Sequence, residues 1–92
     1  MREVPTDLPG AELVGPGLVD LAEGRESIEA LLVSIGYPRL AELGFAIAAP
    51  IPCADLRLYD RLAASDGDAA HGRYNALVRR LVSFERAASC EL

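Results

Sequence analysis

The sequence predicts an all-α fold, a compact bundle of four to five short helices packed around a long C-terminal helix. Apolar residues recur at helical spacing along most of the 92 residues, and Gly or Pro separates the periodic segments. The longest unbroken period covers 68–89, where apolar side chains recur at alternating intervals of four and three. These side chains are Ala70, Tyr74, Leu77, Leu81, Phe84 and Ala88. At about 1.5 Å per residue, such a helix would be about 33 Å long and would cross the whole domain.

Three short helices are predicted in the first half of the chain. The first is expected over about 16–23, because the run Gly15-Pro16-Gly17 should either kink a helix or start one. Ser27 is a suitable N-cap for a second helix over 28–35. A third helix can begin at Pro38 and end at Gly44, since proline suits a first turn and glycine suits a C-terminal stop.

A fourth helix is predicted over about 54–65, joined by a short link to the C-terminal one. So short a link indicates an antiparallel helical hairpin. Asp68 is expected to cap the last helix, where its carboxylate would lie beside unpaired N–H groups. The predicted inward face of the fourth helix consists of Leu56, Tyr59, Leu62 and Ala63.

The composition is that of one folded helical domain spanning 1–92, with a loosely ordered lead-in at 1–8. Hydrophobic residues make up 51% of the chain and charged residues 25%, which is far from the composition of disordered proteins. A net charge of −5 argues against nucleic-acid binding, since duplex binding depends on neutralising phosphates with a basic surface. No nucleic-acid partner is therefore expected.

The expected location is the cytoplasm, with no membrane contact and no cofactor. No run of apolar residues is long enough to span a bilayer, and the N-terminal residues lack the apolar stretch of a signal peptide. The two cysteines fit neither a disulfide scaffold nor a paired metal motif. Cys53 follows an apolar loop at a helix start and is expected to be a buried, inert thiol rather than a reactive one.

An apolar connector over 44–53 contains two prolines and no charged residue. The favoured interpretation is that its large side chains, Phe45, Ile47 and Ile51, pack against the domain's own core. The alternative is that they contact another subunit or protein, because an exposed apolar patch is unusual in a monomer. A short edge strand is a third option, disfavoured by the prolines.

Two further sets of residues are candidates for chemistry or binding. Asp66, Asp68 and His71 lie close together near the start of the last helix and could share a metal ion, or an Asp could orient the histidine for proton transfer. The favoured interpretation is a helix cap beside a surface histidine. Arg73 and Arg80 flank the apolar seam of the last helix and are expected to pair with acidic residues of neighbouring helices.

No phosphate-binding loop, nucleophile elbow or paired-histidine zinc motif is present in the sequence. The leading hypothesis is therefore a non-enzymatic protein-interaction or self-association module, with a homodimer favoured. Its predicted contact residues are Phe45, Ile47, Ile51, Arg73 and Arg80. The alternative is a small ligand- or metal-binding protein or enzyme with a site near Asp66, Asp68 and His71.

Overall fold

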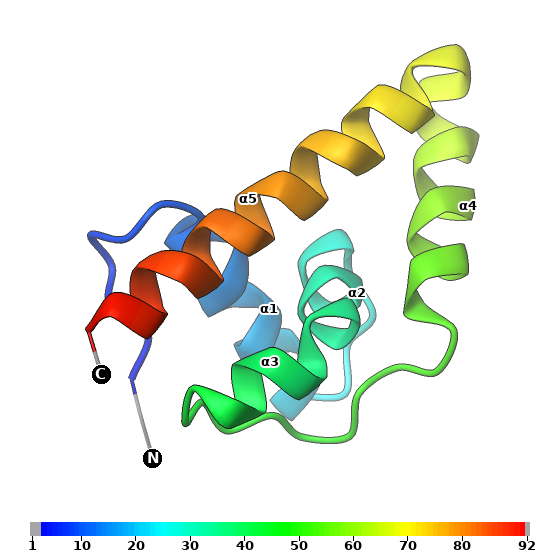
Figure 1. Cartoon of the computed structure of the whole chain (residues 1–92). Helices are drawn as coiled ribbons and strands as arrows, with labels where there is room; N and C mark the ends of the chain where they lie inside the picture. The colour runs from blue at the N-terminus through cyan, green and yellow to red at the C-terminus, as the bar shows by residue number, and fades with distance from the viewer. Residues whose placement is uncertain (1–2, 92) are drawn as a thin grey trace.

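The computed structural model describes residues 3–91 and shows an all-α bundle with a long C-terminal helix, which confirms the predicted fold class (Figure 1). The helices are α1 (Ala11–Ala22), α2 (Ile28–Ile35), α3 (Tyr37–Glu42), α4 (Ala54–Asp66) and α5 (Ala70–Cys90), with a 3₁₀ turn, η1 (Gly67–Ala69), between the last two. Helix α5 runs diagonally across the bundle and reaches beyond α1 and α2 to meet the top of α4. Helices α4 and α5 therefore meet at η1 and diverge from there.

Helix α1 begins earlier than predicted, at Ala11 rather than near Pro16, and carries the proline in its interior. A proline there removes one backbone hydrogen bond, the one that would end on the carbonyl of Glu12. Tertiary packing outweighs that loss, because Val14 in the preceding turn is fully buried. Gly10, with a φ of 82°, precedes the helix in the left-handed conformation that glycine adopts without strain.

Two buried glycines set how closely α1 approaches its neighbours. A Cβ atom added to Gly17 would lie 2.5 Å from the carbonyl oxygen of Glu29 and 2.8 Å from Cγ1 of Val33, both in α2. A Cβ atom added to Gly10 would lie 2.6 Å from the carbonyl oxygen of Arg80 in α5. Because these two positions have no side chain, the backbone of α1 can pack directly against α2, and the residue before α1 can pack directly against α5.

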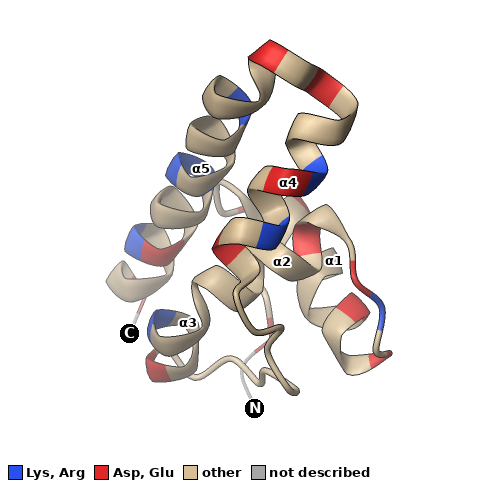
Figure 2. Ribbon diagram, turned by 90° about the vertical axis from the view of Figure 1, so that its right-hand side faces the viewer, with Lys and Arg blue, Asp and Glu red and all other residues tan. Residues whose placement is uncertain are grey.

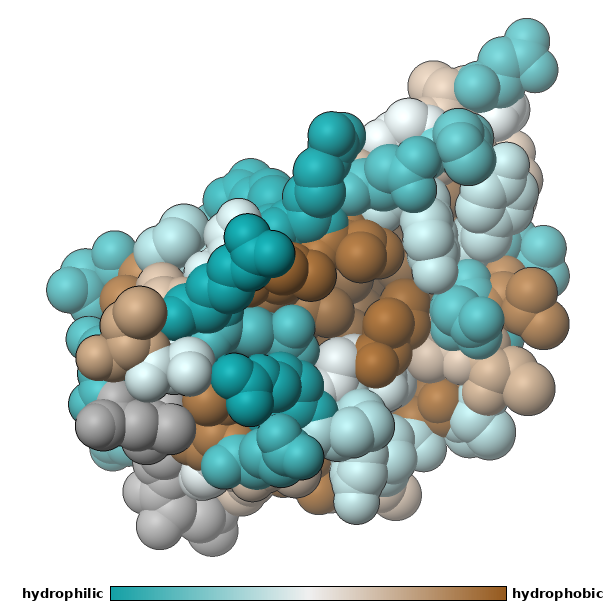
Figure 3. Space-filling model, viewed as in Figure 1, coloured by the Kyte–Doolittle hydropathy of each residue, from teal (hydrophilic) through white to brown (hydrophobic). Residues whose placement is uncertain are grey.

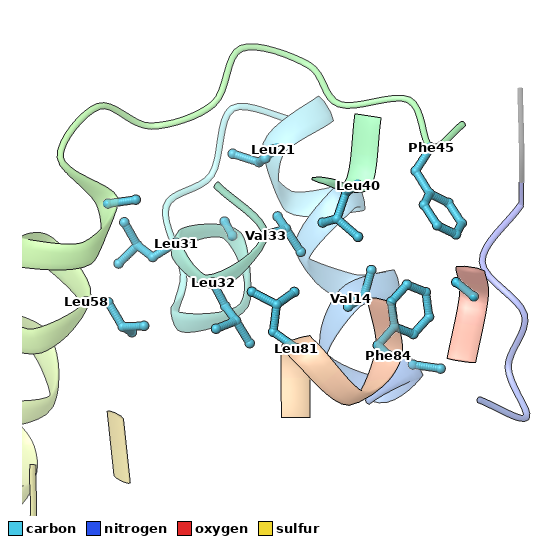
Figure 4. Close-up of a cluster of buried hydrophobic side chains, with 14 of the residues drawn as sticks. Val14, Leu21, Leu31, Leu32, Val33, Leu40, Phe45, Leu58, Leu81 and Phe84 are labelled. Atoms are coloured by element: carbon cyan, nitrogen blue, oxygen red, sulfur yellow. The ribbon is translucent and has the colours of Figure 1, made fainter. Parts of the chain in front are cut away.

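Helix α2 is buried on more than one side. Five consecutive residues, 30–34, are buried. In Figure 4, Leu31 lies on the side of Leu58 from α4, whereas Val14 and Leu81 lie beyond the opposite side of the helix. Helix α2 thus lies between the part of the core formed with α4 and the part formed with α1 and α5.

Ser27 caps α2 as predicted. Its Oγ accepts a hydrogen bond from the N–H of Ala30 at 3.0 Å and donates one to Oδ2 of Asp20 at 2.6 Å. Arg25 donates a second bond to Oδ1 of Asp20 at 3.0 Å. The bond from Ser27, and then those from Arg25, lower the pKa of Asp20. A lowered pKa contributes stability that is present above the usual value of 3.8 and is lost as the pH falls below it.

The apolar connector packs on the chain's own core, as in the favoured interpretation. Phe45 is 4% exposed, forms an isolated β-bridge, and its ring centroid lies 5.5 Å from that of Phe84 in α5 (Figure 4). Ile47 and Ile51 are partly buried against the same core. The N–H of Ile51 donates a hydrogen bond to Oγ of Ser34 at 3.0 Å, which anchors the connector to α2.

Two predictions about the α4–α5 hairpin are wrong. Helix α4 buries Ala54, Leu58 and Leu62, whereas Leu56 and Tyr59, expected to face inward, are exposed. Asp68 does not cap α5: the residue before that helix is Ala69, which makes no side-chain capping bond, and Asp68 lies within η1. The first N–H of the helix, from Ala70, instead donates a backbone hydrogen bond to the carbonyl of Gly67 in the 3₁₀ turn.

The carboxyl group of Glu85 in α5 should make the free energy of unfolding depend on pH. Burial raises the pKa of this carboxyl group, and Arg39 only partly offsets the rise. Because the native state then binds the proton more tightly than the unfolded state, stability is lost as the pH rises from 4.5 through the native pKa. Glu85→Gln should therefore be more stable than the wild type at pH 7 and no different below pH 4.5.

Urea unfolding of both proteins at pH 4 and pH 7 checks this expectation. Glu3→Gln is the control, since Glu3 is exposed and makes no ion pair or hydrogen bond within residues 3–91. A Glu85→Gln protein less stable than the wild type at pH 7 would show that Arg39, rather than burial, governs the group.

Candidate functional site

The outward side of α4 carries a second apolar stripe, which we call the α4 outer face: Leu56, Tyr59 and Ala63. At 100° per residue, its mean direction lies about 130° from the buried stripe of the same helix. The stripe is therefore turned away from the core. In Figure 3, apolar surface is visible at the right-hand edge, over the lower half of α4.

The two large side chains of this face are held differently. Leu56 is 64% exposed, more than any other large hydrophobic residue described. Tyr59 is 39% exposed, and its ring lies 5.8 Å from that of Tyr74 and 6.4 Å from that of His71, both in α5. One edge of the face is thus supported by aromatic contacts with α5, while Leu56 projects into solvent.

Carboxylates border the α4 outer face on both sides. Asp55 and Asp60 each lie about 70° from its mean direction, one on either side. Both are exposed, and neither side-chain carboxylate has an ion pair or hydrogen bond within residues 3–91. Arg57 and Arg61 lie further round the helix, and both bind Glu26, the second at 3.5 Å. Figure 2 shows these charges as red and blue bands on α4, the helix nearest the viewer.

A groove of about 480 Å³ continues from the start of the α4 outer face towards α3. Its residues are Ser34, Ile35, Tyr37, Pro38, Pro50, Ile51, Pro52, Cys53, Ala54 and Asp55. Most of these side chains are apolar, and the hydroxyl group of Ser34 is already bonded to the carbonyl of Ala30 and the N–H of Ile51. The groove therefore suits an apolar side chain better than a polar ligand.

Two further depressions lie elsewhere. One, of about 340 Å³, is on the other side of the Pro50–Pro52 segment, against Leu21 and Arg25. The other, of about 550 Å³, lies between the N-terminal segment and α1 and includes Val4 and Val19. Neither contains a histidine or a cysteine.

Cys53 corrects one expectation, because its thiol is exposed rather than buried. It lies at the rim of the groove, immediately before α4, with a φ of 55°. It is the one non-glycine residue with positive φ among residues 3–91. A left-handed conformation at this point turns the connector into α4.

The acidic cluster near His71 is dispersed in space. Arg73 donates a 2.6 Å hydrogen bond to Oδ2 of Asp66. Nε2 of His71 lies 3.3 Å from the amide nitrogen of Asn75, and both His71 and Asp68 are exposed. Within residues 3–91, no three His, Cys, Asp or Glu side chains are placed to hold a metal ion. None of the three depressions above includes a member of this cluster.

The arginines flanking the seam of α5 pair with neighbouring helices, as predicted. Arg73 binds Asp66 at the end of α4, and Arg80 binds Glu12 of α1. Arg79 and Arg86 point away and have no ion pair or hydrogen bond within the described part of the chain. Arg73 and Arg80 thus help to hold the helices together.

The predicted contact residues and the exposed apolar residues are largely different sets. Phe45 belongs to the core, and Ile47 and Ile51 are partly buried, although Ile51 also lines the groove beside α4. The face formed by Leu56 and Tyr59 was not predicted as a contact. A usable signal was present in the sequence, because α4 has leucines on two sides and a helix at the edge of a small bundle buries only one.

Comparison with known proteins adds no assignment: no family model, curated protein or solved structure matches the chain. No helix within residues 3–91 combines the length and hydropathy that crossing a bilayer requires.

Proposed function

We propose that this protein is a non-enzymatic protein-interaction module that binds its partner through the α4 outer face. The observation that carries the proposal is Leu56, which leaves 64% of its surface in water while smaller apolar side chains elsewhere in the chain are buried. Burying a leucine side chain is worth about 2 kcal/mol, so a binding partner would gain what the fold leaves unused.

The surroundings of Leu56 support a contact surface rather than a reactive site. Tyr59 stands one turn along the same face, and tyrosine is enriched at protein interfaces because it combines apolar area with a polar tip. The prolines of the adjoining groove, Pro38, Pro50 and Pro52, add apolar surface that loses little conformational freedom on binding. Apolar anchors grouped on a rigid helix are typical of interaction surfaces.

Site-specific photo-crosslinking tests this function. A benzophenone amino acid replaces Leu56 in one protein and Ala76, an exposed residue of α5, in the control. After irradiation in cells that express the chain, position 56 should yield a discrete protein adduct that position 76 does not. Mass spectrometry of the adduct separates a second copy of this chain, which would indicate self-association, from a different protein.

Sedimentation velocity over a wide range of concentrations accompanies the crosslinking and measures self-association directly. Adducts that form equally at positions 56 and 76, or at neither position, would contradict an interaction through the α4 outer face.

A further inference from the structure

We infer that the partner for the α4 outer face is a basic amphipathic helix of another protein, with an apolar stripe bordered by Lys or Arg. The inference rests on the proposed function and adds the chemistry of the partner. Its basis is the pair of carboxylates, Asp55 and Asp60, that lie on opposite sides of Leu56 and Tyr59 without an ion pair of their own.

The chain itself has few cations left for these two carboxylates, because most of the described arginines are matched internally. Among residues 3–91, six arginines bind carboxylates of the same chain: Arg25, Arg39, Arg57, Arg61, Arg73 and Arg80. Asp55 and Asp60 have no such match, although two arginines lie on the same helix. Positive charges from a partner would supply the match that the chain's own arginines do not.

A second copy of this chain fits the face poorly. Both borders of the α4 outer face are acidic, so self-pairing across it brings the acidic borders of the two copies together. The arginines of α4, Arg57 and Arg61, already share Glu26. The two unmatched arginines of α5, Arg79 and Arg86, belong to a different helix.

The dimensions of the face suit a helix. Leu56 and Ala63 are seven positions apart, or about 10.5 Å along the axis, which two turns of a partner helix would cover. The small side chain of Ala63 allows a close approach at one end. At the other end, the groove beside Pro52 provides room for a further apolar side chain. Recognition of a helix through anchors one turn apart is a common binding mode.

Two synthetic peptides test the inference with the full chain. Both are 16-residue amphipathic helices with the same Leu and Ala stripe, which Lys borders in one and Glu in the other. Fluorescence anisotropy in low salt should show the Lys peptide binding at least tenfold more tightly than the Glu peptide. The difference should shrink in 1 M salt, where charges are screened beyond about 3 Å.

Variants then assign the binding to this face. Leu56→Ser should weaken binding of the Lys peptide at least fivefold, and Asp55→Asn with Asp60→Asn should reduce its preference over the Glu peptide to about twofold. The matched controls are Val19→Ser, at a residue 55% exposed on α1, and Asp68→Asn, at another exposed carboxylate. Both controls should bind like the wild type.

Equal binding of the two peptides, binding of neither, or equal effects of Leu56→Ser and Val19→Ser would overturn the inference. These failures differ from failure of the proposed function. If position 56 crosslinks to a protein and the Lys peptide does not bind, the interaction stands and the basic helix is wrong. If position 56 gives no specific adduct, the proposed function itself fails.

Discussion

Gly17→Ala should destabilise the protein by about 2 to 3 kcal/mol, although alanine favours helices more than glycine by about 1 kcal/mol. The new Cβ atom would lie 2.5 Å from the carbonyl oxygen of Glu29, and this oxygen belongs to the backbone of α2 and cannot rotate away. Cγ1 of Val33, at 2.8 Å, closes the other side. Helix α1 would have to move from α2, opening the core at Val14. Urea unfolding measures the loss.

Gly15→Ala is the matched control, two residues away in the same helix. Its added Cβ atom would meet nothing closer than Cγ1 of Val4 at 4.0 Å. This change should therefore stabilise the protein by about 0.5 to 1 kcal/mol through helix propensity alone. If the two variants had the same stability, the close approach of α1 to α2 would not be the reason for the glycine.

Local sequence signals predicted the elements well where one residue decides the outcome. The cap at Ser27, the proline at the start of α3 and the glycine after it all act within one turn of chain. The start of α1 was missed for the opposite reason. The cost of Pro16 is local, but the packing that offsets it involves a separate helix, α2.

The α4 outer face could not be located from periodicity alone. Leu56, Leu58 and Leu62 allow two apolar stripes on one helix, and either could face the core. The structure buries the stripe with Leu58, because that side is the one next to α2. Which stripe is free depends on how α4 joins the bundle, and the connector and η1 determine that geometry.

The charges around the two stripes are consistent with this division of roles. Arg61 and Glu26 join α4 to the α1–α2 loop on one side, and Arg73 joins α5 to the end of α4 on the other. These ion pairs thus lie where α4 meets its neighbours. The unmatched Asp55 and Asp60 lie beside Leu56, on the part of α4 that projects into solvent, where the proposed basic partner would bind.

Phe84→Ala should cost about 3 to 5 kcal/mol, a large share of the roughly 5 to 14 kcal/mol expected for a domain of this length. Phe84 is fully buried, and its ring lies 5.5 Å from that of Phe45. Removing the ring opens a cavity where α5 and the connector meet. Tyr37→Ala is the comparison: the Tyr37 side chain is 38% exposed, so its removal should lower the free energy of unfolding by less than about 1 kcal/mol. A loss below 1 kcal/mol for Phe84→Ala would contradict the packing described.

A substitution of Phe45, the residue that packs on Phe84, separates an effect on stability from an effect on binding. Phe45→Leu keeps an apolar side chain in the core and should lower stability by about 1 kcal/mol while the chain stays folded. Because Phe45 packs on Phe84 rather than on the α4 outer face, the variant should bind the Lys peptide within twofold of the wild type. Leu56→Ser should behave in the reverse way, with weaker binding and nearly unchanged stability. If Phe45→Leu weakened binding as much as Leu56→Ser, the connector would be part of the contact.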